Sequence, residues 1–164
     1  MGNPKIPLIL DLGCGLNKQP GAWGIDLHGD QKDQHHNLDR FPWPLPDNHF
    51  LIVYALQVLE HLAKSVQAME EIWRICQNGA IVIISVPDGL CPGYAQDPTH
   101  KSPWNIGTFL YFCPGQFVTE QEMPPYDIKA KFQVLDYHVR EKGKAPWGDQ
   151  WYEDDLRVIL QVVK

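Results

Sequence analysis

Short blocks of apolar, β-branched residues recur along the chain, and turn-forming residues bound each block. Such blocks are typical of strands, and a nearly continuous apolar run indicates a strand buried on both faces of a parallel sheet. Residues 80–86 (AIVIISV) are the strongest example and predict a central strand. The blocks together predict strands over residues 6–12, 22–27, 35–38, 51–56, 80–86, 132–139 and 156–163.

A helical period is clearest in residues 63–76, where apolar side chains recur at intervals of three and four residues. The Gln-Asn-Gly sequence at 77–79 predicts the end of this helix. Residues 104–112 predict a second, shorter helix. Residues 87–107 are rich in Pro and Gly and predict a long loop of the kind that often carries function, and residues 142–155 predict a long connection. Strands that alternate with helices and end in a strand pair predict an α/β sheet with helices on its faces.

The composition narrows the class of protein. The chain has 164 residues, 44% of them hydrophobic and 21% charged, which fits one globular domain over residues 1–164. The formal net charge of −6 argues against a nucleic-acid or anionic-membrane partner, because binding of phosphate groups relies on Lys and Arg. The longest apolar run is too short to cross a bilayer, and no basic-then-apolar leader is visible, so we expect a cytoplasmic protein.

The spacing of cysteines and histidines favours neither a disulfide framework nor a metal centre. No CxxC pair is present, so we expect reduced thiols, with Cys14 packing as a small residue rather than acting as a nucleophile. His35 and His36 are adjacent, and neighbours on an extended strand point to opposite faces. We therefore expect no metal site. The four cysteines are Cys14, Cys76, Cys91 and Cys113.

A glycine-containing turn follows the first predicted strand. Gly13 and Gly15 let the backbone turn sharply and let a ligand approach the main chain, and ligands of open α/β sheets lie beyond the carboxyl ends of the strands. Asp26 ends the second predicted strand, where a carboxylate can accept hydrogen bonds from a ribose diol. Each motif by itself leaves an alternative open. Gly13 and Gly15 could form an ordinary strand-to-helix turn, and Asp26 could simply cap a turn.

With the following segments included, the sequence resembles the class I S-adenosylmethionine-dependent methyltransferases, and in particular their small type 11 branch. The resemblance implies a Rossmann-like three-layer sandwich whose seven-stranded sheet is mostly parallel, with an antiparallel last strand. It also implies S-adenosylmethionine as the cofactor and a small-molecule methyl acceptor. The segments that carry it are LDLGCG (10–15), WGIDL (23–27), NLDRFPWPLPDNHF (37–50), YALQVLEHL (54–62) and RICQNGAIVIISVP (74–87).

The resemblance implies cofactor-binding roles for eleven residues. Asp11, Gly13 and Gly15 would surround the methionyl part. Asp26 would bind the ribose hydroxyls, with Leu27 beside it. The adenine would meet the side chain of Asn37 and the backbone N–H of Leu38, with Asp39 alongside. Asn37 stands where the family usually has an acid, and its carbonyl oxygen can still accept a hydrogen bond from the adenine amino group. The residues that would approach the methionyl group and the transferring methyl are Ala55, Leu56 and Gln57.

The sequence departs from the family pattern near its start. Only nine residues, 13–21, separate the first two predicted strands, whereas a parallel crossover takes about a dozen or more. The first crossover helix is therefore expected to be shortened or absent. No helix is predicted before the first strand, so we expect the usual cover over the substrate to be missing. Such a site could admit a peptide or be closed by a second subunit, which predicts a homodimer.

Methyl transfer requires the acceptor and the methyl group to be held in line, and a base is needed only when the acceptor must lose a proton. The long loop after the fifth predicted strand supplies the polar candidates Asp88, Tyr94, Asp97 and His100. We predict His100 as the base, since imidazole accepts a proton near neutral pH. The alternative for this segment is that Asp97 or Thr99 caps a helix.

Several other features have structural interpretations. Glu60 and His61 at a helix start are typical of capping and of charge complementation rather than catalysis. Trp43 lies between two prolines and predicts a rigid packing element.

Two alternative functions for the whole chain also remain to be weighed. A non-catalytic cofactor-binding or scaffolding protein of the same fold is one, because fold does not establish activity. A nicotinamide-dependent oxidoreductase is disfavoured, because Lys18 stands at the third fingerprint position, where Gly or Ala is needed.

Overall fold

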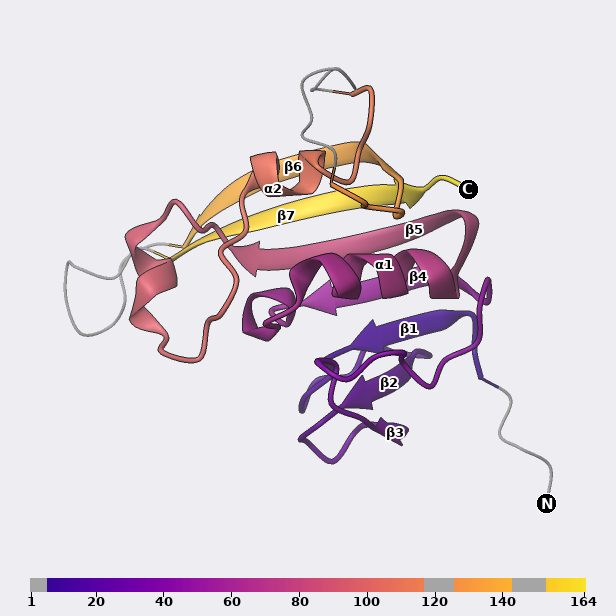
Figure 1. Cartoon of the computed structure of the whole chain (residues 1–164). Helices are drawn as coiled ribbons and strands as arrows, with labels where there is room; N and C mark the ends of the chain where they lie inside the picture. Colours follow the sequence, from indigo (N-terminus) through magenta and orange to yellow (C-terminus); the bar gives the residue numbers. More distant parts are fainter. Residues whose placement is uncertain (1–5, 117–125, 143–152) are drawn as a thin grey trace.

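A seven-stranded sheet forms the centre of the molecule in the computed structural model, which describes residues 6–116, 126–142 and 153–164 (Figure 1). The strand order is β3-β2-β1-β4-β5-β7-β6, and only β7 runs antiparallel to its neighbours β5 and β6. The predicted sheet with its antiparallel last strand is confirmed. The strands are β1 (Ile9–Leu12), β2 (Trp23–Asp26), β3 (Gln34–His35), β4 (Phe50–Leu56), β5 (Cys76–Pro87), β6 (Phe132–Lys142) and β7 (Glu153–Val162).

Two α-helices within the described residues pack against the sheet. The predicted long helix is α1 (Ser65–Ile75), which lies in front of β4 and β5 in Figure 1. The second is α2 (Ile106–Leu110), and its N-cap is Asn105, whose side chain accepts a hydrogen bond from the Thr108 N–H. Two short 3₁₀ helices, η1 (Leu59–His61) and η2 (Pro92–Gln96), follow β4 and β5. None of the described helices is long and apolar enough to span a membrane.

The two faces of the sheet differ in how well they are covered. The row Val53, Val82 and Leu160 runs across β4, β5 and β7, and all three side chains are fully buried beneath the helices. The neighbouring row Tyr54, Ile83 and Ile159 points to the opposite face, and its side chains are only half-buried. The first turn of α1 and α2 border the same cavity, so both described α-helices lie on one face. Over its described residues the sheet therefore has one helical layer, in place of the two that a three-layer sandwich implies.

A loop replaces the first crossover helix, as the short spacing predicts. Residues 13–22 contain no helix and lie over the second face of β1 and β2. The loop is fastened there by a hydrogen bond of 2.7 Å from the Gln19 N–H to the Asp11 carboxylate. A Cβ atom on Gly24 would lie 2.8 Å from the Cys14 sulfur, so the small residue in β2 allows the loop to pack closely.

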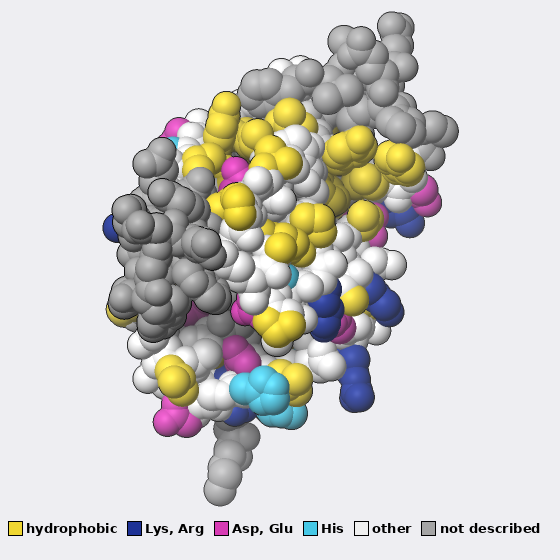
Figure 2. All heavy atoms as spheres, turned by 90° about the vertical axis from the view of Figure 1, so that its left-hand side faces the viewer, with side chains coloured by type: hydrophobic (Ala, Val, Ile, Leu, Met, Phe, Trp, Pro, Cys, Tyr) yellow, Lys and Arg dark blue, Asp and Glu magenta, His cyan; other side chains and the backbone are white. Residues whose placement is uncertain are grey.

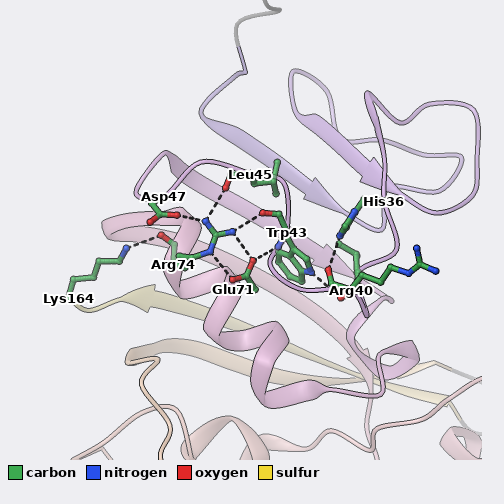
Figure 3. Close-up of polar contacts among 9 residues, drawn as sticks. His36, Arg40, Trp43, Leu45, Asp47, Glu71, Arg74 and Lys164 are labelled. Atoms are coloured by element: carbon green, nitrogen blue, oxygen red, sulfur yellow. Dashed lines mark hydrogen bonds and ion pairs between the residues drawn. The ribbon is translucent and has the colours of Figure 1, made fainter.

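The crossover from β3 to β4 is also a loop, and α1 holds it in place (Figure 3). The Arg74 guanidinium donates to the backbone carbonyls of Leu45 and Trp43, each at 3.0 Å, and also contacts the Asp47 carboxylate. The Glu71 carboxylate binds Arg74 at 2.7 Å and accepts the Trp43 N–H at 2.6 Å. The Trp43 side chain is 2% exposed, which confirms its predicted packing role.

Some element boundaries differ from those predicted. Helix α1 ends at Ile75 and β5 begins at the next residue, so residues 77–79 belong to the strand. Strand β6 continues to Lys142 and β7 begins at Glu153, so the connection is shorter than the predicted 142–155. Residues 143–152 of this connection lie outside the described residues. No helix begins at Asp97 or Thr99, and the N-cap of the next helix is Asn105, so the alternative that Asp97 or Thr99 caps the start of a helix is wrong.

Candidate functional site

A cavity of about 600 Å³ opens where β1, β2 and β4 end, a volume within the range of small-molecule and cofactor sites. Figure 2 shows the molecule from this edge, with histidine and charged side chains gathered below a larger hydrophobic area. The predicted residues that line the cavity are Gly13, Asp26, Leu27, Asn37, Leu38, Asp39 and Gln57. The other lining residues are His28, His36, Val58, His61, Leu62, Pro98, Thr99 and Lys101.

The Asp26 carboxylate is fixed in place by two backbone donors. Its Oδ2 atom accepts a hydrogen bond from the Gly15 N–H at 2.8 Å, and its Oδ1 atom accepts one from the His28 N–H at 2.6 Å. Each carboxylate oxygen has a second lone pair, so both can still accept hydrogen bonds from a ligand. The side chain lines the cavity at the end of β2. This orientation suits a pair of neighbouring ligand hydroxyl groups.

Gly13 places the backbone of the loop after β1 at the edge of the cavity, next to Val58. Its φ angle is +65°, in the left-handed region that disfavours residues with a Cβ atom, and its N–H donates to the Ile25 carbonyl at 2.9 Å. A Cβ atom at this position would lie 2.4 Å from Cγ2 of Val58. The position therefore requires glycine for both its conformation and its contact with Val58.

Asp11 is not among the lining residues and has a supporting position instead. Its side chain is 3% exposed and lies on the second face of the sheet, beneath the loop that Gln19 belongs to. Burial raises the pKa of the Asp11 carboxyl. Cys14 in the same loop is 5% exposed, and burial raises the pKa of its thiol to about 11. This protonated thiol fits the predicted packing role rather than a nucleophile.

The segment after β3 forms one wall of the cavity. The Asn37 side-chain oxygen accepts a hydrogen bond from the Asp39 N–H at 2.9 Å, so part of its acceptor capacity is used locally. The Asp39 carboxylate accepts the Ala63 N–H at 2.8 Å and binds the Lys101 ammonium at 3.1 Å. Asp39 therefore links this wall to the segments that follow β4 and β5.

Gln57 follows β4 in an unusual backbone conformation, with φ at +55°. Its N–H donates to the Ser85 carbonyl at 2.7 Å, and its side-chain amide donates to the Ser85 hydroxyl and to the Asp155 carboxylate, each at 3.1 Å. These bonds fix Gln57 at the cavity edge.

Four of the predicted residues do not line the cavity: Asp11, Gly15, Ala55 and Leu56. Of these, Gly15 contributes indirectly, because its N–H holds the Asp26 carboxylate in place.

The predicted base, His100, lies behind the cavity wall. Its side chain is 5% exposed, its Nδ1 atom lies 2.8 Å from the Tyr94 carbonyl, and its ring lies 5.0 Å from the ring of His61. His61 itself lines the cavity, together with Thr99. The interpretation of Glu60 as a cap is wrong, because this residue is fully buried and η1 has no side-chain cap.

The fold, a family model and solved structures all relate this chain to methyltransferases. The order of the strands and the cavity at their carboxyl ends define the Rossmann-like fold of class I methyltransferases. Residues 10–84 match the family model described as "Methyltransferase domain". The resemblance to the type 11 branch of the class I S-adenosylmethionine-dependent methyltransferases is thereby confirmed. No curated protein matches the chain.

Solved structures share the fold at low sequence identity. A SAM-dependent methyltransferase from Archaeoglobus fulgidus is 15% identical, with a TM-score of 0.59, over 93% of this chain and 85% of that one. An S-adenosylmethionine-dependent methyltransferase from Mesorhizobium loti is 14% identical, with a TM-score of 0.58, over 98% and 93% of the two chains. The [4+2]-cyclase SpnF is also similar, at 14% identity and a TM-score of 0.60, over 94% of this chain and 75% of that one.

The residues present fit a nucleoside cofactor. The fixed Asp26 carboxylate offers acceptors for two hydroxyl groups, and the half-buried Asn37 and buried Leu38 provide a polar and an apolar surface on the neighbouring wall. On the other side, Gly13 leaves main chain, rather than a side chain, at the cavity edge. This combination of acceptors, apolar wall and open main chain corresponds to a ribose, a base and a charged tail.

Proposed function

We propose that this chain is a methyltransferase that uses S-adenosylmethionine to methylate an oxygen or nitrogen atom of a small molecule in the cytoplasm. The observation that carries the proposal is the Asp26 carboxylate, which the N–H groups of Gly15 and His28 hold at the edge of the cavity. The net charge of −6 supports a small-molecule acceptor over a nucleic acid.

The chain's own residues would divide the cavity into a cofactor half and an acceptor half. Asp26 would bind the ribose hydroxyls, and Asn37 and Leu38 would border the adenine. Gly13 and Gln57 would border the methionyl part. When bound, S-adenosylmethionine supplies a methyl group already activated by its sulfonium, so the protein's main task is to orient the acceptor.

The acceptor half would be formed by the segments that follow β4 and β5. His61, Thr99 and Lys101 line this part of the cavity and offer polar groups to an acceptor. The role of His100 as a general base stays a prediction. Its Nδ1 atom is hydrogen-bonded to Tyr94, and its imidazole lies behind His61 rather than on the wall.

A non-catalytic cofactor-binding protein is the second candidate. The loop over residues 13–22 in place of the first crossover helix favours it, because the cover over this side of the site is reduced. The similarity to the [4+2]-cyclase SpnF shows that the same fold can carry a function other than methyl transfer. This candidate predicts cofactor binding without methyl transfer to any acceptor.

Calorimetry would separate the candidates. Titrating the purified chain with S-adenosylhomocysteine, S-adenosylmethionine and NADH should give heat for the first two only. Incubation with radiolabelled S-adenosylmethionine and a library of hydroxyl and amine compounds should then transfer label to an acceptor. Binding without transfer would support the second candidate, and no binding of either nucleoside would overturn both. Light scattering on the same sample tests the predicted homodimer.

A further inference from the structure

Glu60, His61 and His100 form a compact group beside the cavity. One ligand atom of each residue lies within 4.8 Å of the others, and His61 Nε2 lies 4.0 Å from Glu60 Oε1. Glu60 and His61 belong to η1, directly after β4, whereas His100 belongs to the loop between η2 and α2. Glu60 is fully buried, and a carboxylate removed from water is stabilised by a nearby positive charge.

The hydrogen bond of His100 fixes which of its ring nitrogens can bind a ligand. Nδ1 lies 2.8 Å from the Tyr94 carbonyl oxygen, which can only accept. Nδ1 therefore carries the hydrogen and donates it. In the neutral ring the lone pair is then on Nε2. The ring also stacks on the Tyr94 ring, with 5.0 Å between their centroids, which holds it in this orientation.

The same argument applies to His61. Its Nδ1 atom lies 3.1 Å from the Thr99 hydroxyl oxygen. That hydroxyl donates its own hydrogen to the Asp97 carboxylate at 2.6 Å, so towards His61 it can only accept. His61 Nδ1 therefore donates, and its Nε2 atom carries the lone pair. Both histidines thus carry the ring lone pair on Nε2. The Nε2 atom of His61 lies 4.0 Å from Glu60 Oε1, and that of His100 lies 3.7 Å from Asp97 Oδ2.

From these contacts we propose that Glu60, His61 and His100 bind one divalent transition-metal ion of the zinc type. Two imidazole nitrogens and one carboxylate oxygen are ligands that Zn²⁺ prefers, at about 2.0–2.2 Å each. Two ligand atoms that share one ion are then at most about 4 Å apart. The 4.0 Å between His61 Nε2 and Glu60 Oε1 meets this limit. The ligand atom of His100 lies within 4.8 Å of the other two, so a small side-chain rotation would bring it to the ion.

The surroundings of the group match those of metal sites. Histidine ligands usually donate their second ring N–H to a carbonyl, hydroxyl or carboxylate that orients the ring. Tyr94 supplies a carbonyl to His100, and Thr99, itself bonded to Asp97, supplies an acceptor to His61. Three protein ligands leave a coordination position for a substrate, as in catalytic zinc sites.

The position of this metal site suggests its use. His61 lines the cavity, so an ion on its Nε2 atom would lie beside the proposed acceptor half. Such an ion would orient an oxygen atom of the acceptor and favour loss of its proton, which points to a hydroxyl-bearing acceptor. This use rests on the proposed methyltransferase function, whereas metal binding itself does not.

Cobalt titration tests the site directly. Tag-free protein, dialysed against EDTA and then freed of it, should bind one Co²⁺ per chain with a visible d–d absorption band that Zn²⁺ abolishes. Glu60→Gln, His61→Gln and His100→Gln should each weaken Co²⁺ binding at least tenfold. Thr99→Val should weaken it about tenfold through the orientation of His61. The exposed His138 on β6 gives the matched control, and His138→Gln should leave binding unchanged.

Several outcomes would overturn the site. They are absence of Co²⁺ binding in the unmodified chain, a thiolate charge-transfer band, or ligand variants that bind Co²⁺ as tightly as the unmodified chain does. Circular dichroism establishes that each variant is folded. If a ligand variant does not fold, Thr99→Val still allows the test, because Thr99 is exposed and the substitution replaces only its hydroxyl group.

Calorimetry with S-adenosylhomocysteine on the same samples distinguishes the metal site from the proposed methyltransferase function. Nucleoside binding without Co²⁺ binding overturns the metal site alone, and Co²⁺ binding without nucleoside binding overturns the proposed function alone.

Discussion

The Asp26 carboxylate accepts a hydrogen bond from the N–H of Gly15 at 2.8 Å. The bond joins the end of β2 to the loop that follows β1, so the two motifs that predict a nucleoside site are physically one unit. A ligand that binds Asp26 therefore also depends on the conformation of the glycine-containing loop.

Replacing Asp26 tests this unit. Asp26→Ala should weaken binding of S-adenosylhomocysteine at least tenfold, because hydrogen bonds to a charged group are each worth about 1.5–3 kcal/mol. Calorimetric titration measures the affinity. Asp30→Ala removes a neighbouring exposed carboxylate and should leave the affinity unchanged. Equal losses in both variants would mean that general charge, rather than Asp26, governs binding.

Gly13→Ala should destabilise the fold through two separable effects. The left-handed backbone at +65° disfavours alanine, and the new methyl group would collide with Val58. We expect a loss of about 3 kcal/mol in the free energy of unfolding, measured with urea. Gly21→Ala is the control, since Gly21 has a φ of +75° but open space around its Cα, and should lose only about 1 kcal/mol. Equal losses would show that the contact with Val58 is unimportant.

Arg74→Met should loosen the crossover from β3 to β4. Arg74 is the shared partner of two carbonyl groups and two carboxylates, and the hydrogen bond with Glu71 raises the pKa of its guanidinium. Removing it leaves Glu71 partly buried without this partner, so we expect a loss of about 3 kcal/mol in urea denaturation. Arg140→Met on exposed β6 should cost under about 0.5 kcal/mol. A similar loss in both variants would contradict the role assigned to the Arg74 cluster.

Buried thiols should make the fold sensitive to alkali. Burial raises the pKa of Cys76 from 9.0 to about 12, so between these values the unfolded chain loses a proton that the folded chain keeps. The free energy of unfolding should therefore fall as the pH rises above 9, by about 1.4 kcal/mol per pH unit for this thiol. Urea denaturation at pH 9.5 and 10.5 measures the slope, which should be shallower in Cys76→Ala. An unchanged slope would exclude Cys76 as a source.

Local patterns in the sequence predict most of the sheet, because buried strands need continuous apolar residues wherever they lie. The missing first crossover helix also follows from spacing alone. The place of Asp11 illustrates what such patterns leave out. Leu10 and Leu12 occupy the helix-covered face, so alternation along β1 sends Asp11 to the other face, where Gln19 binds it. The motif places Asp11 near the cofactor, whereas the strand turns its side chain away from the cavity.

Most of the proposed acceptor half of the cavity could not be predicted from the sequence. Glu60 and His61 resemble a helix start in sequence, and only the fold shows that Glu60 is buried and that His61 lines a cavity. Thr99 reaches His61 from 38 residues away, and Lys101 reaches Asp39 from 62 residues away. No local period encodes such distant contacts. The one available signal was the position of His61 just beyond the end of β4.

The bond between Gln57 and Asp155 has a consequence for how the molecule comes into being. The segments that resemble the methyltransferases end at residue 87, while Asp155 belongs to the last strand, 98 positions beyond Gln57. A ribosome would release every recognisable motif long before the final strand inserts between β5 and β6. A nascent chain stopped short of β7 would thus carry the complete signature of its family, yet one edge of its binding site would still be unfinished.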